Sequence, residues 1–254
     1  MPTAAALPAY LDRIGYTGSV SPTLETLRAM HHAHFLSIPF ENLDIQRGNP
    51  IVVDLDHNYD KIVTRRRGGF CLELTSLFGW ALREIGFSVD VLGGRVMTPT
   101  GALGEPLSHM ALVVHLDEPW LADVGFGGRV AQPLRLAERG PQVAGASTYT
   151  VSNDGDHWFI TCLDPWLAPQ APRTYVLTLR PRELSEFANV CQWLQTSPES
   201  AFTRGDVVSL STEAGRVSYS PGRLIIASGD SREERDVPPE AVPAVWNERF
   251  GITL

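Results

Sequence analysis

The stretch Arg65-Arg66-Arg67-Gly68-Gly69-Phe70-Cys71-Leu72-Glu73 leads from a predicted loop into a predicted helix. Its two glycines allow a tight turn and a close approach of the backbone to a ligand. They deliver Cys71 to the first turn of the helix, where unpaired N–H groups and the helix dipole favour a thiolate and can hold an oxyanion. The alternative is that Cys71 is only a small buried hydrophobic residue, as free cysteines commonly are. We adopt that alternative for Cys162 and Cys191, which lack such an entry loop.

Outward from this stretch, helical spacing dominates the first third of the chain. Apolar residues recur at helical spacing over residues 7–14, 24–35, 56–66 and 71–85. Ser21-Pro22 gives a start signal for the second of these helices. We therefore predict that residues 1–87 form a helical bundle that carries Cys71.

After Gly86 the apolar period changes from 3.6 toward 2. Residues 88–181 are predicted to form an antiparallel β region from short strands over 87–96, 109–116, 120–124, 148–152, 158–162 and 175–179. A further helix, several short strands and a last helix near 239–249 indicate a small α/β segment over 182–254. The acidic cluster Asp230–Asp236 is predicted to be a solvated turn. The expected fold class is α+β.

Composition excludes several classes of protein. The 254 residues contain 21 basic and 29 acidic side chains, so a net charge of −8 speaks against a nucleic-acid binder or a polybasic membrane-surface protein. Three scattered cysteines form neither a disulfide framework nor a zinc cluster, and the histidines lack ligand spacing, so no metal is assigned. No signal peptide or spanning helix is evident. We therefore expect a cytoplasmic protein with no nucleic-acid or membrane partner.

A nucleophilic thiol needs a base, and the base needs an orienting group. His109 opens one apolar strand and is a candidate for the base. The alternative is that it is only a strand-edge residue whose hydrogen bonds are satisfied. Asp123 lies at the end of the next strand, where a carboxylate needs a partner to offset its lost hydration. Only a short turn separates the two strands, so a hairpin would bring His109 and Asp123 side by side. Cys71, His109 and Asp123 then form a predicted triad.

The order Cys, His, Asp resembles that of papain-like and transglutaminase-like cysteine enzymes. His109 follows Cys71 by about 40 residues, whereas papain-type proteases place the histidine some 130–150 residues downstream. The spacing therefore excludes a papain protease.

Five motifs resemble the arylamine N-acetyltransferase family and follow the family's order from Tyr10 to Leu254. They are Ile38-Pro39-Phe40-Glu41-Asn42-Leu43-Asp44, Arg66-Arg67-Gly68-Gly69-Phe70-Cys71, Ser108-His109, Asp123-Val124-Gly125-Phe126-Gly127 and residues 194–202. The resemblance implies a helical bundle, a β-barrel and an α/β lid around a papain/transglutaminase-like cysteine core. It further implies that Cys71 is the nucleophile, His109 the base and Asp123 the orienting acid. Leu72 departs from the family pattern, where an aromatic residue commonly follows the cysteine.

The resemblance also implies the substrates. The expected donor is acetyl-CoA or another acyl thioester, used as a co-substrate with no permanently bound cofactor, and the expected acceptor is an arylamine or a related nitrogen compound. We expect ping-pong transfer through a Cys71 acyl-enzyme. A hydrolase that gives the acyl group to water and a catalytically silent binding scaffold are the rival functions.

Weaker hypotheses concern residues around the predicted triad. Glu41 and Arg67 are expected to pair beneath the nucleophile, although two unrelated solvated charges are the alternative. The aromatic residues Phe70, Phe126 and Phe202 are candidates for an acceptor pocket, although most aromatic residues simply belong to a core. Residues 126–129, with Gly127 and Gly128, are a candidate path for pantetheine or the CoA phosphates, although a glycine pair is more often only a turn.

One alternative activity comes from the end of the sequence. Many family members continue beyond the position of Leu254, and a short C-terminus predicts a wider groove above Cys71. A subgroup of similar proteins, the amide synthases of ansamycin-type polyketide assembly, closes a carrier-bound chain onto its own arylamine as a macrolactam. An acyl carrier protein is then the partner, although the net charge of −8 offers it no obvious basic dock.

Overall fold

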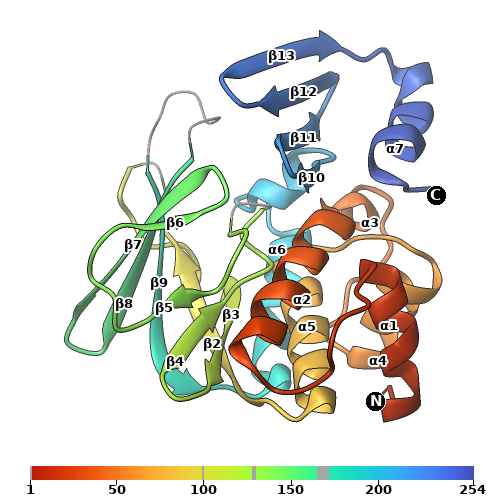
Figure 1. Ribbon diagram of the computed structural model, residues 1–254. Helices are drawn as coiled ribbons and strands as arrows, with labels where there is room; N and C mark the ends of the chain where they lie inside the picture. The colour runs from red at the N-terminus through yellow and green to blue at the C-terminus, as the bar shows by residue number, and fades with distance from the viewer. Residues whose placement is uncertain (1, 99, 128–129, 165–171) are drawn as a thin grey trace.

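The computed structural model describes residues 2–98, 100–127, 130–164 and 172–254. The N-terminal helices pack together on one side of the molecule, and a curved sheet lies beside them (Figure 1). A second sheet and the C-terminal helix lie above these two parts in the same view. None of the described helices has the length and apolarity needed to cross a membrane.

The predicted helical start of the chain is confirmed. Its helices are η1 (Ala4–Ala6), α1 (Leu7–Ile14), α2 (Leu24–Ser37), α3 (Leu43–Gln46), α4 (Leu55–Tyr59), the π-helical turn η2 (Asp60–Thr64) and α5 (Cys71–Ile85). Helix α2 begins two residues later than Pro22 predicts. The Thr23 hydroxyl accepts a hydrogen bond from the Thr26 N–H at 3.2 Å, and this cap sets the start of the helix.

Helix α5 is the central element of the fold. Every residue from Cys71 to Leu82 is buried, and the helix packs against α1, α4 and the first two strands of the curved sheet. A helix that is covered on all sides is held by core packing rather than by one amphipathic face. Its N-terminus, and with it Cys71, therefore has a fixed place beside the curved sheet.

The curved sheet of the described residues has eight strands, and all neighbouring strands are antiparallel. The strands are β2 (Ser88–Val96), β3 (His109–His115), β4 (Pro119–Ala122), β5 (Leu134–Arg135), β6 (Gln142–Ala144), β7 (Ser147–Asp154), β8 (His157–Leu163) and β9 (Arg173–Pro181). Their order is β5-β4-β3-β2-β9-β8-β7-β6. The two outermost strands, β5 and β6, are connected by a side chain: Gln142 of β6 hydrogen-bonds to both the N–H and the C=O of Arg135 of β5. The sheet is therefore a nearly closed barrel.

The second sheet joins the C-terminal region to the segment that precedes Cys71. Its order is β1 (Phe40–Glu41), β10 (Val208–Thr212), β11 (Gly215–Ser220), β12 (Arg223–Ser228) and β13 (Ser231–Asp236). The helices of this region are η3 (Leu184–Phe187), α6 (Ala188–Thr196), η4 (Ala201–Arg204), η5 (Pro239–Ala241) and α7 (Val242–Phe250). Phe40 also bridges to Gly69, so this sheet reaches the loop that carries the cysteine. The α+β fold class is confirmed.

The acidic cluster Asp230–Asp236 is not a solvated turn, which corrects the prediction. Its last six residues form strand β13, which pairs with β12 along its whole length. The side chains are exposed, and neighbouring charges pair with each other, as Arg232 does with Glu234 and Arg235 with Glu233. A charged strand suits this position because β13 is the free edge of the sheet, and charges discourage pairing with another chain.

Candidate active site

Cys71 occupies the first turn of α5 and is 3% exposed. The loop before it can pass so close to the rest of the protein only because Gly68 has no side chain. A Cβ at that position would lie 2.0 Å from the backbone oxygen of Pro39. The Cys71 Sγ lies 3.6 Å from the backbone oxygen of Ser108, the residue just before His109. The entry loop and the first residues of β3 therefore meet at the thiol.

His109 and Asp123 come together through the predicted hairpin of β3 and β4. Leu112 pairs with Ala122, so the register places Asp123 diagonally across from His109 on the same face. The His109 Nε2 lies 2.8 Å from the Asp123 Oδ2, and the two side chains are 2% and 0% exposed. Because Nε2 faces the carboxylate, Nδ1 is the ring nitrogen left for the thiol.

Charge, rather than burial, decides the protonation of this pair. Burial lowers the pKa of His109, but the charge of Asp123, its hydrogen bond and the hydrogen bond with Cys71 together raise it to about 10. Burial raises the pKa of Asp123, but the charge and hydrogen bond of His109 outweigh this and lower it. The pair is therefore an imidazolium and a carboxylate at neutral pH. An imidazolium beside a thiol favours the nucleophilic thiolate.

Two residues to which the sequence analysis assigned no role complete the surroundings of this pair. The Tyr175 ring packs against the His109 ring with centroids 4.6 Å apart, because β9 pairs with β2 next to β3. The Gly125 N–H donates to the Asp123 Oδ1 at 2.9 Å, and a Cβ on Gly125 would lie 2.8 Å from the Cys71 Cα. Gly125 therefore lets the carboxylate loop touch the backbone of the cysteine.

Of the three phenylalanines predicted to line an acceptor pocket, two contact each other and the third packs on His109. Phe126 packs on the His109 ring at 5.3 Å between centroids, whereas Phe70 packs edge-on against Phe202 at 5.6 Å. Phe70 is fully buried, and Phe202 is only half-buried. Gly127 is described with a φ of 59°, and Gly128 and Arg129 lie outside the described residues.

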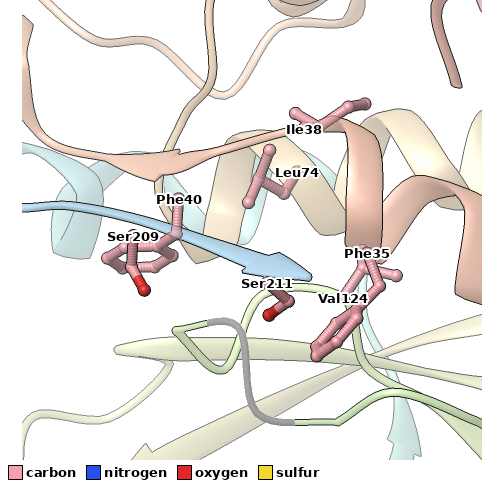
Figure 2. Close-up of a pocket in the computed structure, with 7 residues that line it drawn as sticks. All are labelled: Phe35, Ile38, Phe40, Leu74, Val124, Ser209 and Ser211. Atoms are coloured by element: carbon pink, nitrogen blue, oxygen red, sulfur yellow. The ribbon is translucent and has the colours of Figure 1, made fainter. Parts of the chain in front are cut away.

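A small pocket lies beside the segments that carry Cys71 and Asp123. Leu74, one turn after Cys71 on α5, and Val124, next to Asp123, contribute to its wall (Figure 2). The full lining is Phe35, Ile38, Phe40, Leu74, Val124, Ser209 and Ser211. None of the three predicted phenylalanines belongs to this lining.

Glu41 and Arg67 pair beneath the entry loop, with 2.7 Å between the Arg67 guanidinium and the Glu41 Oε1. Arg67 also contacts Asp44, whose second oxygen lies 2.8 Å from the Lys61 Nζ. Lys61 in turn bonds at 2.8 Å to the Glu73 Oε1. The predicted pair is thus one end of a longer chain of buried charges.

This chain of charges ends at the backbone of the cysteine loop. The Glu73 Oε2 accepts a hydrogen bond from the Phe70 N–H at 3.0 Å, just before Cys71. Burial alone would raise the pKa of Asp44, but Lys61 and Arg67 lower it to about 2, and the three acids raise the pKa of the fully buried Lys61. The sequence analysis missed this role of Lys61, although Lys61 is the chain's single lysine.

Lys61→Met is expected to destabilise the fold by roughly 3–5 kcal/mol, because it leaves the buried carboxylates of Asp44 and Glu73 short of a cation. Urea unfolding followed by circular dichroism measures the loss. Lys61→Arg, which keeps the charge, and the double variant Lys61→Met/Glu73→Gln are expected to recover part of it. An unchanged urea midpoint in Lys61→Met contradicts this role.

Stability is expected to fall on both sides of neutral pH. The pKa of His109 is raised from 6.5 to about 10, so its stabilising proton is lost as the pH rises from 6.5 to 10. Burial lowers the pKa of His31 from 6.5 to about 4. Between pH 6.5 and 4 the unfolded chain therefore binds a proton at His31 that the folded chain does not, and the folded state loses stability as the pH falls. Each group then contributes a slope of roughly 1 kcal/mol per pH unit.

Urea unfolding at a series of pH values measures both slopes. His109→Gln is expected to flatten the alkaline slope and to leave the acid slope in place. A free energy of unfolding that stays level from pH 6.5 to 10 in the unmodified protein contradicts the charged state of His109.

No group of three or more His, Cys, Asp or Glu side chains among the described residues is arranged to hold a metal ion.

Comparison with known proteins gives the family. Residues 23–254 match the N-acetyltransferase family. The chain is 36% identical over 265 residues to an arylamine N-acetyltransferase of Mycolicibacterium smegmatis, which covers 99% of this chain and 93% of that protein. It is 32% identical over 250 residues to the arylamine N-acetyltransferase of Escherichia coli (strain K12), which covers 96% and 87%.

The folds agree as well. The structure of Mycobacterium marinum arylamine N-acetyltransferase in complex with CoA matches with a TM-score of 0.87 at 32% identity, over 97% of this chain and 92% of that one. Sequence and fold thus agree over nearly the full length of the relatives, and the chain belongs to the arylamine N-acetyltransferase family of transferases.

Proposed function

We propose that this enzyme moves an acetyl group from acetyl-CoA to the nitrogen of an arylamine through a thioester on Cys71. The observation that carries the proposal is the buried His109–Asp123 pair, 2.8 Å between Nε2 and Oδ2, next to a thiol at a helix N-terminus. Relatives at 32% and 36% identity are named arylamine N-acetyltransferases, and a relative of known structure binds CoA.

In the first half-reaction, the Cys71 thiolate attacks the thioester carbonyl carbon. The first N–H groups of α5 stabilise the negative charge on the carbonyl oxygen of the tetrahedral intermediate. The carbon–sulfur bond to CoA then breaks, and imidazolium His109 gives its proton to the departing thiolate. The products are CoA with a free thiol, acetyl-Cys71 and a neutral His109.

In the second half-reaction, the arylamine nitrogen attacks the carbonyl carbon of acetyl-Cys71. An arylamine is suited to this step because its low basicity leaves it neutral and nucleophilic near pH 7. Neutral His109 takes the proton that the nitrogen loses, and Asp123 stabilises the imidazolium that forms. The Cys71 thiolate leaves, so the amide product and the starting ion pair appear together.

The surrounding residues take supporting roles in this proposal. Glu41 and Arg67 hold the loop before the nucleophile through their 2.7 Å ion pair. We assign Phe70, Phe126, Phe202 and Gly127 to the walls that meet the substrates. The division into residues 1–87, 88–181 and 182–254 has its support in the barrel, which begins with β2 at Ser88 and ends with β9 at Pro181.

Intact mass spectrometry tests the proposal in two steps. Acetyl-CoA alone is expected to add the mass of one acetyl group to the protein, and a simple aniline added afterwards is expected to remove it and yield the acetanilide. Loss of the acetyl group to water at the same rate without aniline would instead indicate a hydrolase.

The same assay addresses the amide synthase alternative. A bulky aryl-amino acyl thioester, such as an N-acetylcysteamine mimic of a long chain, is offered in place of acetyl-CoA. Loading from the bulky thioester together with no loading from acetyl-CoA would replace the proposed donor with a carrier-bound chain.

A further inference from the structure

A second histidine, His31, contacts the backbone of Asp123. The His31 Nε2, on helix α2, accepts a hydrogen bond from the Asp123 backbone N–H at 3.2 Å. His31 is 0% exposed and Asp123 is 1% exposed. Solvent therefore cannot replace this bond, and a buried N–H left without an acceptor is costly.

The place of Asp123 in the sheet explains why its N–H needs such a partner. Strand β4 ends at Ala122, so the peptide of Asp123 has already left the ladder with β3. Gly125 holds one carboxylate oxygen of Asp123, and His109 holds the other. The His31 bond is the contact that fixes the backbone from which this carboxylate projects.

The His31 ring is itself held in one orientation and one protonation state. Phe78 of α5 packs edge-on against it, with centroids 5.6 Å apart and planes at 85°. Burial lowers the pKa of His31 to about 4, and His32 lowers it further, although Asp123 and the Ala131 carbonyl raise it. The ring is therefore neutral at pH 7, and since Nε2 accepts a hydrogen bond, the proton lies on Nδ1.

We propose that His31 is a positioning residue for acyl transfer: as a neutral acceptor it fixes the Asp123 peptide, and thereby the aim of the Asp123 carboxylate at His109. This role rests on the proposed function, because it acts through the two residues assigned to proton transfer. A misplacement of about 1 Å in such a group can lower a rate by roughly a hundredfold.

The chain offers a matched control on the same helix. His34 is also buried, and its ring also packs edge-on against Phe78, at 5.3 Å between centroids. Its Nδ1 lies 2.7 Å from the Tyr10 hydroxyl, away from Asp123. His34→Phe therefore removes a comparable buried imidazole without touching the site.

The test compares kcat, KM and the urea midpoint of His31→Phe, His31→Gln and His34→Phe. We expect His31→Phe to lower kcat by roughly ten- to a hundredfold with KM for the arylamine unchanged. His31→Gln, whose amide oxygen can replace the acceptor, should recover most of the loss. His34→Phe should keep kcat within about threefold of the unmodified protein at a similar loss of stability. If His31→Phe does not fold, the smaller His31→Leu takes its place.

A second readout needs no turnover. The rate of Cys71 alkylation by iodoacetamide, measured over a range of pH, reports the reactive thiolate, and near neutral pH it should fall in His31→Phe and not in His34→Phe. An unchanged alkylation profile and kcat in folded His31→Phe, or equal losses in both variants, would overturn the role of His31. Failure of the unmodified protein to accept acetyl from acetyl-CoA would instead overturn the proposed function, and the alkylation profile would still test His31.

Discussion

Cys71→Ser is expected to abolish acetyl loading and to lower turnover by at least roughly a thousandfold. A hydroxyl is far less acidic than a thiol, and an imidazolium partner does not convert it into a standing nucleophile. The side chains are nearly the same size, so the fully packed start of α5 should be preserved. Intact mass spectrometry with acetyl-CoA and a steady-state assay with an arylamine measure the two losses.

The two other cysteines provide controls for this variant. Burial raises the pKa of Cys191 to about 12, and its Sγ donates to the backbone oxygen of Ile51, so it is a thiol at neutral pH. Cys162 is fully buried on β8 in the interior of the barrel. Cys191→Ser and Cys162→Ser should both still load acetyl. Near-normal turnover in Cys71→Ser, or loss of loading in either control, contradicts the assignment of the nucleophile.

Asp123→Asn is expected to lower kcat by roughly 10⁴-fold, by analogy with the loss of the orienting acid in a serine triad. The amide keeps the shape and can still accept the Gly125 N–H, but it carries no charge to stabilise the imidazolium. The pKa of His109, about 10 beside the carboxylate, should fall to its ordinary value of 6.5 or below. NMR titration of the His109 ring measures that fall, independently of any rate.

The contrast with Asp90→Asn separates a site effect from a general loss of charge. Asp90 of β2 pairs with His115 of β3 at 2.8 Å, and both of these side chains are substantially exposed. We expect this variant to change stability by less than about 1 kcal/mol and to leave turnover intact. A folded Asp123→Asn protein with full activity would make Asp123 a structural residue only.

Local sequence was enough for the elements that carry the pair and the thiol. The glycine pair before Cys71 predicts a tight entry into a helix, and the alternating strands around residues 109 and 123 predict the hairpin. Both signals act between residues that are close in sequence, where periodicity and turn chemistry decide the conformation. The same logic failed at Asp230–Asp236, because the pairing with β12 outweighed a composition typical of a turn.

Short strands were the elements that local signals missed. Strands β1 and β5 are two residues long, and each exists because another strand offers its backbone: β10 for β1, and β4 for β5. A two-residue segment has too little length to show a period. The pairing of β1 with β10 is nevertheless what brings the C-terminal region onto the loop beside Cys71.

By itself, then, the sequence determined the fold class, the family and the three residues that we propose carry the chemistry, because motif and period are properties of neighbouring residues. Only the tertiary structure decided which groups surround them. His31 contacts the Asp123 N–H although the two residues are 92 positions apart in the sequence, Tyr175 arrives through β9, and Lys61 links two carboxylates that sequence left unconnected. The physical reason is that burying a polar or charged group costs free energy unless a partner lies within hydrogen-bond distance. The packed fold supplies that partner, which can lie anywhere along the chain.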